Sequence, residues 1–100
     1  MTKISFYEDD GHFKVKALGH ASGSPSVCAA ISGIMYALAG YLQNSECDIQ
    51  SMKLNAADAE IKFSGGESAS AVYLMTVIGL MQIAKAHPEY AEIEEQKRQP

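Results

Sequence analysis

His20 and Cys28 are the residues of this chain whose types and spacing point most directly to chemistry. His20 follows a run of alternating residues, and Cys28 lies just inside a predicted helix. A helix N-terminus and a neighbouring imidazole both favour the thiolate, which is the nucleophilic form of cysteine. The helix dipole stabilises such an anion by roughly 0.3–1 kcal/mol, less than one pKa unit, so His20 must supply most of the activation. The pair therefore suggests nucleophilic catalysis with His20 as the general base.

Spacing alone leaves a second interpretation open. A lone cysteine on an apolar helix is usually a small core residue, and a lone histidine beside a glycine is usually a surface group at a strand end. Without further information, this structural interpretation of His20 and Cys28 is the more common one.

Small residues fill the loop between the histidine and the cysteine. They include Ala21, Ser22, Gly23 and Ser24. We expect this segment to be a mobile substrate loop. The helix N-terminus beside it offers backbone N–H groups that could hold an oxyanion. Ser32 lies one helical turn after Cys28 and faces the same way, so it either supports the site by a hydrogen bond or bonds back to its own helix.

The elements that must position these residues follow from hydrophobic periodicity. Alternating residues predict strands over 3–8, 13–17, 49–54 and 59–63. Ser24 as N-cap and Pro25 at the first position predict a helix that runs to Gln43. A second helix is expected over 68–85, where His87-Pro88 stops it.

This order predicts an α+β fold with the topology ββαββα. We expect a four-stranded, mostly antiparallel sheet with two helices packed on one face. Residues 1–100 should form a single domain, and residues 89–100 a partly frayed, solvated tail.

Composition limits the partners of the chain. Hydrophobic residues make up 47% of its 100 residues and the net charge is -4, with the lysines spread along the chain, so no nucleic-acid partner is expected. No signal peptide is recognisable, and no stretch has the apolar length needed to span a membrane. The expected location is the cytoplasm, with reduced thiols.

No cofactor or metal is expected. A zinc site would have to combine His12, His20, Cys28 and Cys47, which lack paired ligand spacing. Cys47 matches no motif, and its expected role is structural.

The second helix is apolar on nearly every side. A sheet covers one face of a helix, so the surplus must be buried by the other helix or by a second copy of the chain. We expect both, and hence a homodimer. Gly79 would permit close approach of the helices.

Two segments, Gly19-His20-Ala21 and Val27-Cys28-Ala29-Ala30-Ile31-Ser32, resemble the signature of the ribosomal-processing cysteine proteases, the Prp family. The hairpin with its Asp10-Gly11 turn and the segment from Met75 to Tyr90 are similar to the family's opening and C-terminal parts. The resemblance covers nearly the whole chain. It implies a Cys28–His20 dyad, a homodimer, and removal of an N-terminal extension from protein twenty-seven of the large ribosomal subunit. Phage relatives that process capsid and scaffold proteins imply an alternative substrate.

The chain departs from the family pattern beside the cysteine. Pro25 stands where members usually have an aspartate, and the loop before it is shorter. This departure motivates a rival hypothesis, an inactive dimeric module that binds a protein segment without cutting it. A third hypothesis is a thiol redox sensor, in which Cys47 would have to approach Cys28.

Overall fold

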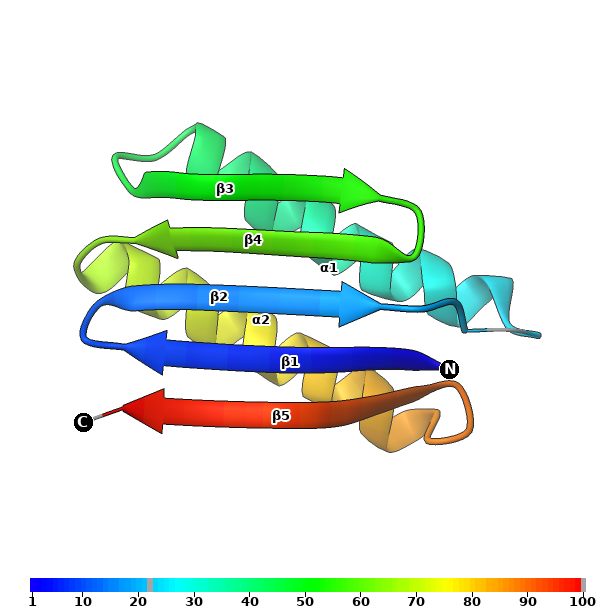
Figure 1. Cartoon of the computed structure of the whole chain (residues 1–100). Helices are drawn as coiled ribbons and strands as arrows, with labels where there is room; N and C mark the ends of the chain where they lie inside the picture. The colour runs from blue at the N-terminus through cyan, green and yellow to red at the C-terminus, as the bar shows by residue number, and fades with distance from the viewer. Residues whose placement is uncertain (22, 100) are drawn as a thin grey trace.

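The computed structural model describes residues 1–21 and 23–99, and it consists of one sheet covered on one face by two helices (Figure 1). The elements are β1 (Thr2–Asp9), β2 (His12–Leu18), α1 (Pro25–Gln43), β3 (Asp48–Asn55), β4 (Asp58–Ser64), α2 (Glu67–Ala86) and β5 (Ala91–Gln99). The strand order in the sheet is β3-β4-β2-β1-β5. The two predicted hairpins and both predicted helices are present, and α1 has the predicted bounds, because local alternation, turns and caps specify them.

The prediction of four strands and a frayed tail is wrong, because Ala91–Gln99 forms the fifth strand, β5. β5 pairs in parallel with β1, so the sheet is mixed. Its charged side chains resembled a solvated tail, but an edge strand with one open face accommodates such residues. Ala91, only 1% exposed, attaches the strand to the core.

The core lies between the sheet and the helices. Ile4 and Phe6 of β1, Val15 of β2 and Ile61 and Phe63 of β4 are fully buried. One stripe of each helix packs on them, and these stripes include Met35, Leu38, Leu42, Val77 and Leu80. The helices also approach each other closely at Gly79, where an added Cβ would lie 3.0 Å from Ile34 Cδ1.

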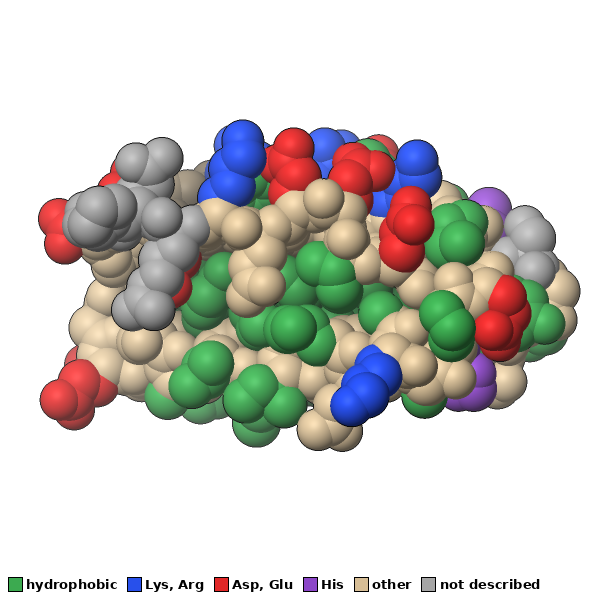
Figure 2. All heavy atoms as spheres, turned by 90° about the horizontal axis from the view of Figure 1, so that it is seen from below, with side chains coloured by type: hydrophobic (Ala, Val, Ile, Leu, Met, Phe, Trp, Pro, Cys, Tyr) green, Lys and Arg blue, Asp and Glu red, His purple; other side chains and the backbone are tan. Residues whose placement is uncertain are grey.

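The outer face of α2 stays exposed, so the helices do not bury each other fully. We call Leu74, Met75, Ile78 and Met81 the α2 patch; their exposed fractions are 57%, 66%, 48% and 40%. Figure 2 shows hydrophobic side chains gathered over the helical layer and charged side chains along the open face of the sheet.

The expectation about membrane-spanning length is also wrong. Both α1, with 19 residues, and α2, with 20, are long and apolar enough to cross a membrane by length and composition. Core helices pass the same test, and each of these helices packs a buried stripe on the sheet.

Candidate active site

The end of β2 holds His20 through its backbone. Gly19 has φ +92°, a left-handed conformation that favours glycine, and its N–H donates to the Ala57 carbonyl at 2.9 Å. A Cβ on Gly19 would lie 2.5 Å from the Met1 carbonyl oxygen. The buried Thr2 hydroxyl donates to the Gly19 carbonyl at 3.0 Å, and the Met1 amino group donates to the His20 carbonyl at 2.6 Å. Strand β1 and the β3–β4 turn therefore fix where His20 leaves the sheet.

The start of α1 positions Cys28 as the sequence predicts. Ser24 is the N-cap, its hydroxyl accepts from the Val27 N–H at 3.3 Å, and Pro25 occupies the first turn. Cys28 is the fourth residue of a helix whose first turn contains no acidic residue. The positive end of the helix dipole is therefore not neutralised by a carboxylate in that turn.

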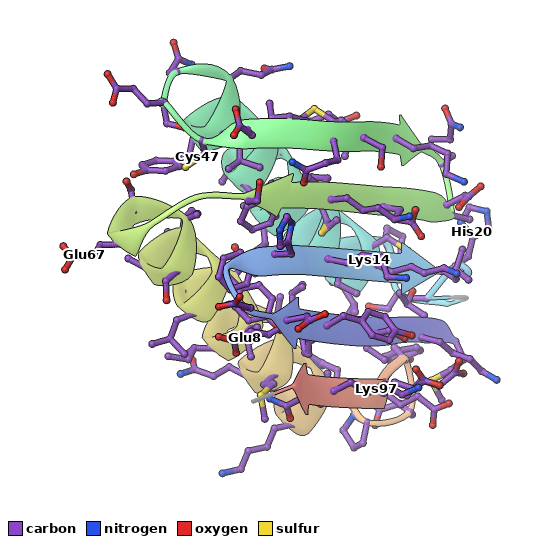
Figure 3. All side chains as sticks on the ribbon, turned by 60° about the vertical axis from the view of Figure 1, so that its left-hand side comes forward. Glu8, Lys14, His20, Cys47, Glu67 and Lys97 are labelled. Atoms are coloured by element: carbon purple, nitrogen blue, oxygen red, sulfur yellow. The ribbon has the colours of Figure 1, made fainter. Side chains whose placement is uncertain are left out.

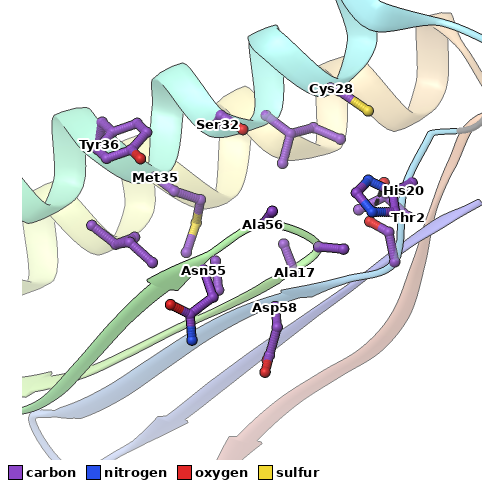
Figure 4. Close-up of a pocket in the computed structure, with 15 residues that line it drawn as sticks. Thr2, Ala17, His20, Cys28, Ser32, Met35, Tyr36, Asn55, Ala56 and Asp58 are labelled. Atoms are coloured by element: carbon purple, nitrogen blue, oxygen red, sulfur yellow. Dashed lines mark hydrogen bonds between the residues drawn. The ribbon is translucent and has the colours of Figure 1, made fainter.

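His20 and Cys28 line the same cavity, which has a volume of about 340 Å³. Figure 4 shows the side chains of His20 and Cys28 at one end of this cavity. Ser32 and Tyr36 line it further along α1. The opposite wall is the β3–β4 turn from Asn55 to Asp58. The fold thus joins two residues from different elements at one opening.

The sulfur of Cys28 contacts the loop backbone. The Ala21 N–H donates to Cys28 Sγ at 3.2 Å, and Sγ lies 3.8 Å from the Ala21 carbonyl oxygen. Among the described residues, no hydrogen bond joins Cys28 to His20. Hydrogen bonds of catalytic groups are often long without substrate and tighten when it binds.

Several N–H groups of the helix start are not free to hold an oxyanion. Pro25 has none, the Val27 N–H donates to the N-cap, and the Cys28 N–H donates to the Ser24 carbonyl at 3.2 Å. The Ala21 amide donates directly to the sulfur of Cys28 at 3.2 Å. The candidate oxyanion donor is therefore the loop amide of Ala21 and not the first amides of α1.

The remaining predicted site residues divide into two groups. Ser32 lies on the cavity wall, and Gly23 and Ser24 form the loop before the helix, whereas Ser22 lies outside the described residues.

Cys47 follows the C-terminal end of α1, so roughly 20 Å of helix separates it from Cys28. Figure 3 shows Cys47 and His20 at opposite ends of the molecule. A disulfide between the two free cysteines would require refolding, which weighs against the redox-sensor hypothesis.

No metal centre is formed by the residues that the structure describes. Within residues 1–21 and 23–99, no group of three or more His, Cys, Asp or Glu side chains could hold an ion.

Three contributors to the site were missed from the sequence. Thr2 and Ala57 are far from the candidate dyad in the chain, and Tyr36 was not singled out within the predicted helix. Tyr36 continues the line from Cys28 through Ser32 at intervals of four residues, and this periodicity was the available signal. No local sequence pattern marks Thr2 or Ala57, because their hydrogen bonds to Gly19 form only when distant strands come together.

A cysteine near a helix N-terminus and a histidine at a strand end, lining one cavity, are the groups that a thiol hydrolase requires. A sequence model of the family described as cysteine protease Prp matches residues 1–94. The chain belongs to this family of cysteine proteases. A search of curated protein sequences finds no match.

Solved structures share the fold. The ribosomal processing protease Prp from Staphylococcus aureus, in complex with a covalently linked product peptide, has a TM-score of 0.76 at 17% identity, covering 99% of this chain and 100% of that chain. The same protease with a substrate peptide has a TM-score of 0.78 at 15% identity, covering 95% and 99%. A Streptococcus mutans protein has a TM-score of 0.75 at 22% identity, covering 97% and 95%.

Proposed function

We propose that this cysteine protease removes an N-terminal extension from a large-subunit ribosomal protein, with Cys28 as nucleophile and His20 as general base. The observation that carries the proposal is the shared cavity, which both side chains line beside a helix N-terminus. The family match supports peptide-bond hydrolysis, and the ribosomal processing function of the Staphylococcus aureus protease supports the substrate class.

The reaction begins at the sulfur. His20 accepts the thiol proton of Cys28, and the thiolate attacks the scissile carbonyl carbon. The resulting tetrahedral intermediate carries an oxyanion, and the Ala21 N–H, at 3.2 Å from the sulfur in the free protein, is placed to donate to it. Substrate binding then replaces the Ala21–Cys28 contact by a contact between Ala21 and the substrate oxygen.

The second half of the reaction returns the enzyme to its starting state. His20 donates its proton to the leaving amine as the peptide bond breaks, which leaves a thioester on Cys28. Water, deprotonated by His20, attacks the thioester carbon. The carbon–sulfur bond then breaks, the new carboxylic acid end leaves, and His20 returns its proton to the sulfur of Cys28. Each step moves one proton through one imidazole, so no cofactor is required.

The cavity fits an extended peptide. One wall is α1, with Ser32 and Tyr36 beyond the nucleophile, and the other is the β3–β4 turn. Small side chains widen the space between them: Ala17, Ala56, Ala57 and Ala59. A side chain of the substrate enters this space while its backbone passes Cys28. Ser32 supports the site as a hydrogen-bonding group on the cavity wall.

Intact-mass analysis tests the proposed reaction. The chain, its Cys28→Ala variant and a matched Cys47→Ala variant are each incubated with an N-terminally extended large-subunit ribosomal protein twenty-seven. We expect the parent chain and Cys47→Ala to shorten the substrate by one defined segment, and Cys28→Ala to leave its mass unchanged. Equal substrate masses after all incubations would contradict the proposal. Cleavage of a phage capsid or scaffold protein instead would favour the phage-type alternative.

Alkylation separates the protease from the inactive binding module. Because an imidazole that takes the thiol proton raises the thiolate fraction, iodoacetamide should label Cys28 at pH 7 at least tenfold faster than a free cysteine. His20→Ala should remove most of that acceleration, whereas His12→Ala should not. Labelling no faster than that of free cysteine would support a module that holds the segment without cutting it.

We also propose that the protein is a homodimer that works in the cytoplasm. The exposed α2 patch supports a second copy as the partner, since a water-exposed apolar helix face is stabilised by burial. The two free cysteines are suited to a reducing compartment.

A further inference from the structure

The open face of the sheet, opposite the helices and the catalytic cavity, carries cations that the reaction does not use. In the sheet register, Lys62 of β4 lies opposite Lys14 of β2, and Lys14 lies opposite Tyr7 of β1. Lys97 of β5 is the partner of Tyr7 on its other side. We call Lys62, Lys14, Tyr7 and Lys97 the lysine row. Figure 3 shows Lys14 and Lys97 on their strands of the sheet.

The lysine row differs from its neighbour in charge compensation. In the next row, Lys16 lies opposite Glu60, and their charged groups are 4.0 Å apart. Within the described residues, Lys14 and Lys62 form no ion pair, although they are direct cross-strand neighbours. Like charges in this position destabilise a sheet. Neither ammonium group forms an ion pair with a described carboxylate, although the charge of Glu95 also acts on Lys14. An anion bound between the two lysines would therefore relieve their mutual repulsion.

An aromatic ring lies within the same row. Lys14 Nζ is 4.1 Å from the centroid of the Tyr7 ring, and Lys97 Nζ is 5.9 Å from it. The Tyr7 hydroxyl donates to Glu95, whose carboxylate lies 3.7 Å from Lys97 Nζ. Glu95 thus partly compensates the charge of Lys97 and, to a lesser extent, that of Lys14. Lys62 and Lys14, which lie side by side in the register, are the pair that we assign to an anion.

The row borders a shallow cavity of about 370 Å³. Its charged and polar lining includes His12 and Gln50 beside the lysines, and Glu8 and Asp9 from the end of the β1–β2 hairpin. This volume exceeds that of a single phosphate and falls in the range of pockets for organic ligands. Glu8 and Asp9 repel anionic groups of a ligand, so these groups would bind on the side of Lys14 and Lys62.

We propose that the lysine row binds a short single-stranded RNA segment, with phosphates on Lys14 and Lys62 and a base against Tyr7. This proposal revises the expectation from the sequence, in which these lysines are spread along the chain and only the sheet brings them together. Sheet faces that combine aromatic rings with cations are a common platform for unpaired nucleotides. Lys14 can leave the ring for a phosphate because its side chain is long and flexible. An acidic peptide would use the lysines but would gain no stacking from Tyr7, so the ring favours RNA.

Fluorescence anisotropy with a labelled eight-nucleotide uridine RNA tests the proposal. Two phosphate contacts on a single strand predict a logarithmic salt slope of about -1.4, so the affinity should fall roughly sevenfold between 50 and 200 mM salt. Lys14→Ala and Lys62→Ala should each reduce the slope by about 0.7. Lys16→Ala is the matched control, because Lys16 is on the same strand and face but is paired with Glu60, and its slope should equal that of the parent chain.

Tyr7→Leu separates stacking from charge attraction. Loss of one stacked base should weaken RNA binding about fivefold or more without changing the salt slope. Circular dichroism checks the fold of each variant, and the Lys14→Ala/Lys62→Ala double variant carries the test if Tyr7→Leu does not fold.

Four results would overturn the assignment to RNA. The first two are no RNA binding by the parent chain and equal loss of affinity in Lys16→Ala. The others are equally tight binding of an eight-residue polyglutamate peptide and displacement of the RNA by millimolar inorganic phosphate, which would make the site one for a simple anion. None of these results depends on whether the chain cleaves a ribosomal protein.

Discussion

At the scale of single residues, the site depends on contacts that hold the backbone around His20. Gly19 connects β2 to the histidine in a conformation that side chains disfavour, and the Thr2 hydroxyl and the Ala57 carbonyl bond to its peptide groups. The Ala21 amide then meets the sulfur of Cys28. The backbone beside the proposed catalytic pair is therefore held by hydrogen bonds from Thr2, Ala57 and Ala21.

Gly19→Ala should damage both folding and the site. The new Cβ would meet the Met1 carbonyl oxygen at 2.5 Å, and φ +92° is unfavourable for alanine, so we expect a loss of about 2 kcal/mol or more in the free energy of unfolding. Urea denaturation measures this loss, and iodoacetamide labelling of Cys28 should slow in parallel.

Gly33→Ala is the matched control for that substitution. Gly33 lies inside α1, and a Cβ there meets nothing within 4 Å. Because alanine favours a helix interior over glycine, this variant should gain roughly 0.5–1 kcal/mol. If Gly19→Ala and Gly33→Ala changed the free energy of unfolding equally, the backbone at position 19 would tolerate a Cβ atom, which contradicts the prediction.

At the scale of elements, β5 joins the sheet through contacts that titrate. The Tyr7 hydroxyl of β1 donates to Glu95 of β5, and this bond, together with the charge of Lys97, lowers the pKa of Glu95 below its usual 4.5. The same bond is the main cause that raises the pKa of Tyr7 above its usual 10.0, with burial and the charge of Glu95 adding to it. The β1–β5 pair is thus stabilised between the two usual pKa values.

The stability of the chain should follow these shifts. The folded state releases the Glu95 proton more readily than the unfolded chain, so its stabilisation is present above pH 4.5 and is lost as the pH falls further. Tyr7 keeps its proton longer when folded, so its contribution is present below pH 10.0 and is lost as the pH rises through the folded pKa. Thermal denaturation from pH 3 to 7 measures this effect. As the pH falls, the melting temperature of Glu95→Gln should decrease less than that of the parent chain. An identical decline would mean that the bond contributes nothing.

At the scale of the whole molecule, the two faces differ in chemistry. The helical layer exposes the α2 patch, and the sheet exposes the lysine row, while the catalytic cavity opens between α1 and the β3–β4 turn. A dimer through the helices would leave the sheet face free. Catalysis, self-association and RNA binding would then occupy separate surfaces of one small domain.

Ile78→Glu should convert the proposed dimer to a monomer. Ile78 is 48% exposed at the centre of the α2 patch, and two buried carboxylates at a symmetric interface would repel each other. Light scattering coupled to size exclusion should give twice the chain mass for the parent and one chain mass for the variant. Ser51→Glu, an exposed change on β3, should remain dimeric. A parent chain that is monomeric at tens of micromolar would contradict the dimer.

Much of the fold and of the candidate site could be predicted because it depends on neighbours along the chain. The cap at Ser24, the turn at Gly11 and the alternation of Phe13, Val15 and Ala17 each specify a local structure. His20 and Cys28 were recognisable because a short loop and a helix start separate them, and both do line one cavity.

The sequence by itself determined the two hairpins, the two helices and the candidate dyad, since periodicity and caps act over a few residues. The tertiary structure alone decided the pairing of β5 with β1, the placement of Thr2 beside Gly19, and the row that joins Lys14, Lys62 and Lys97. These contacts join segments far apart in the chain and form only when the strands pair. No short stretch of residues therefore carries a signal for them.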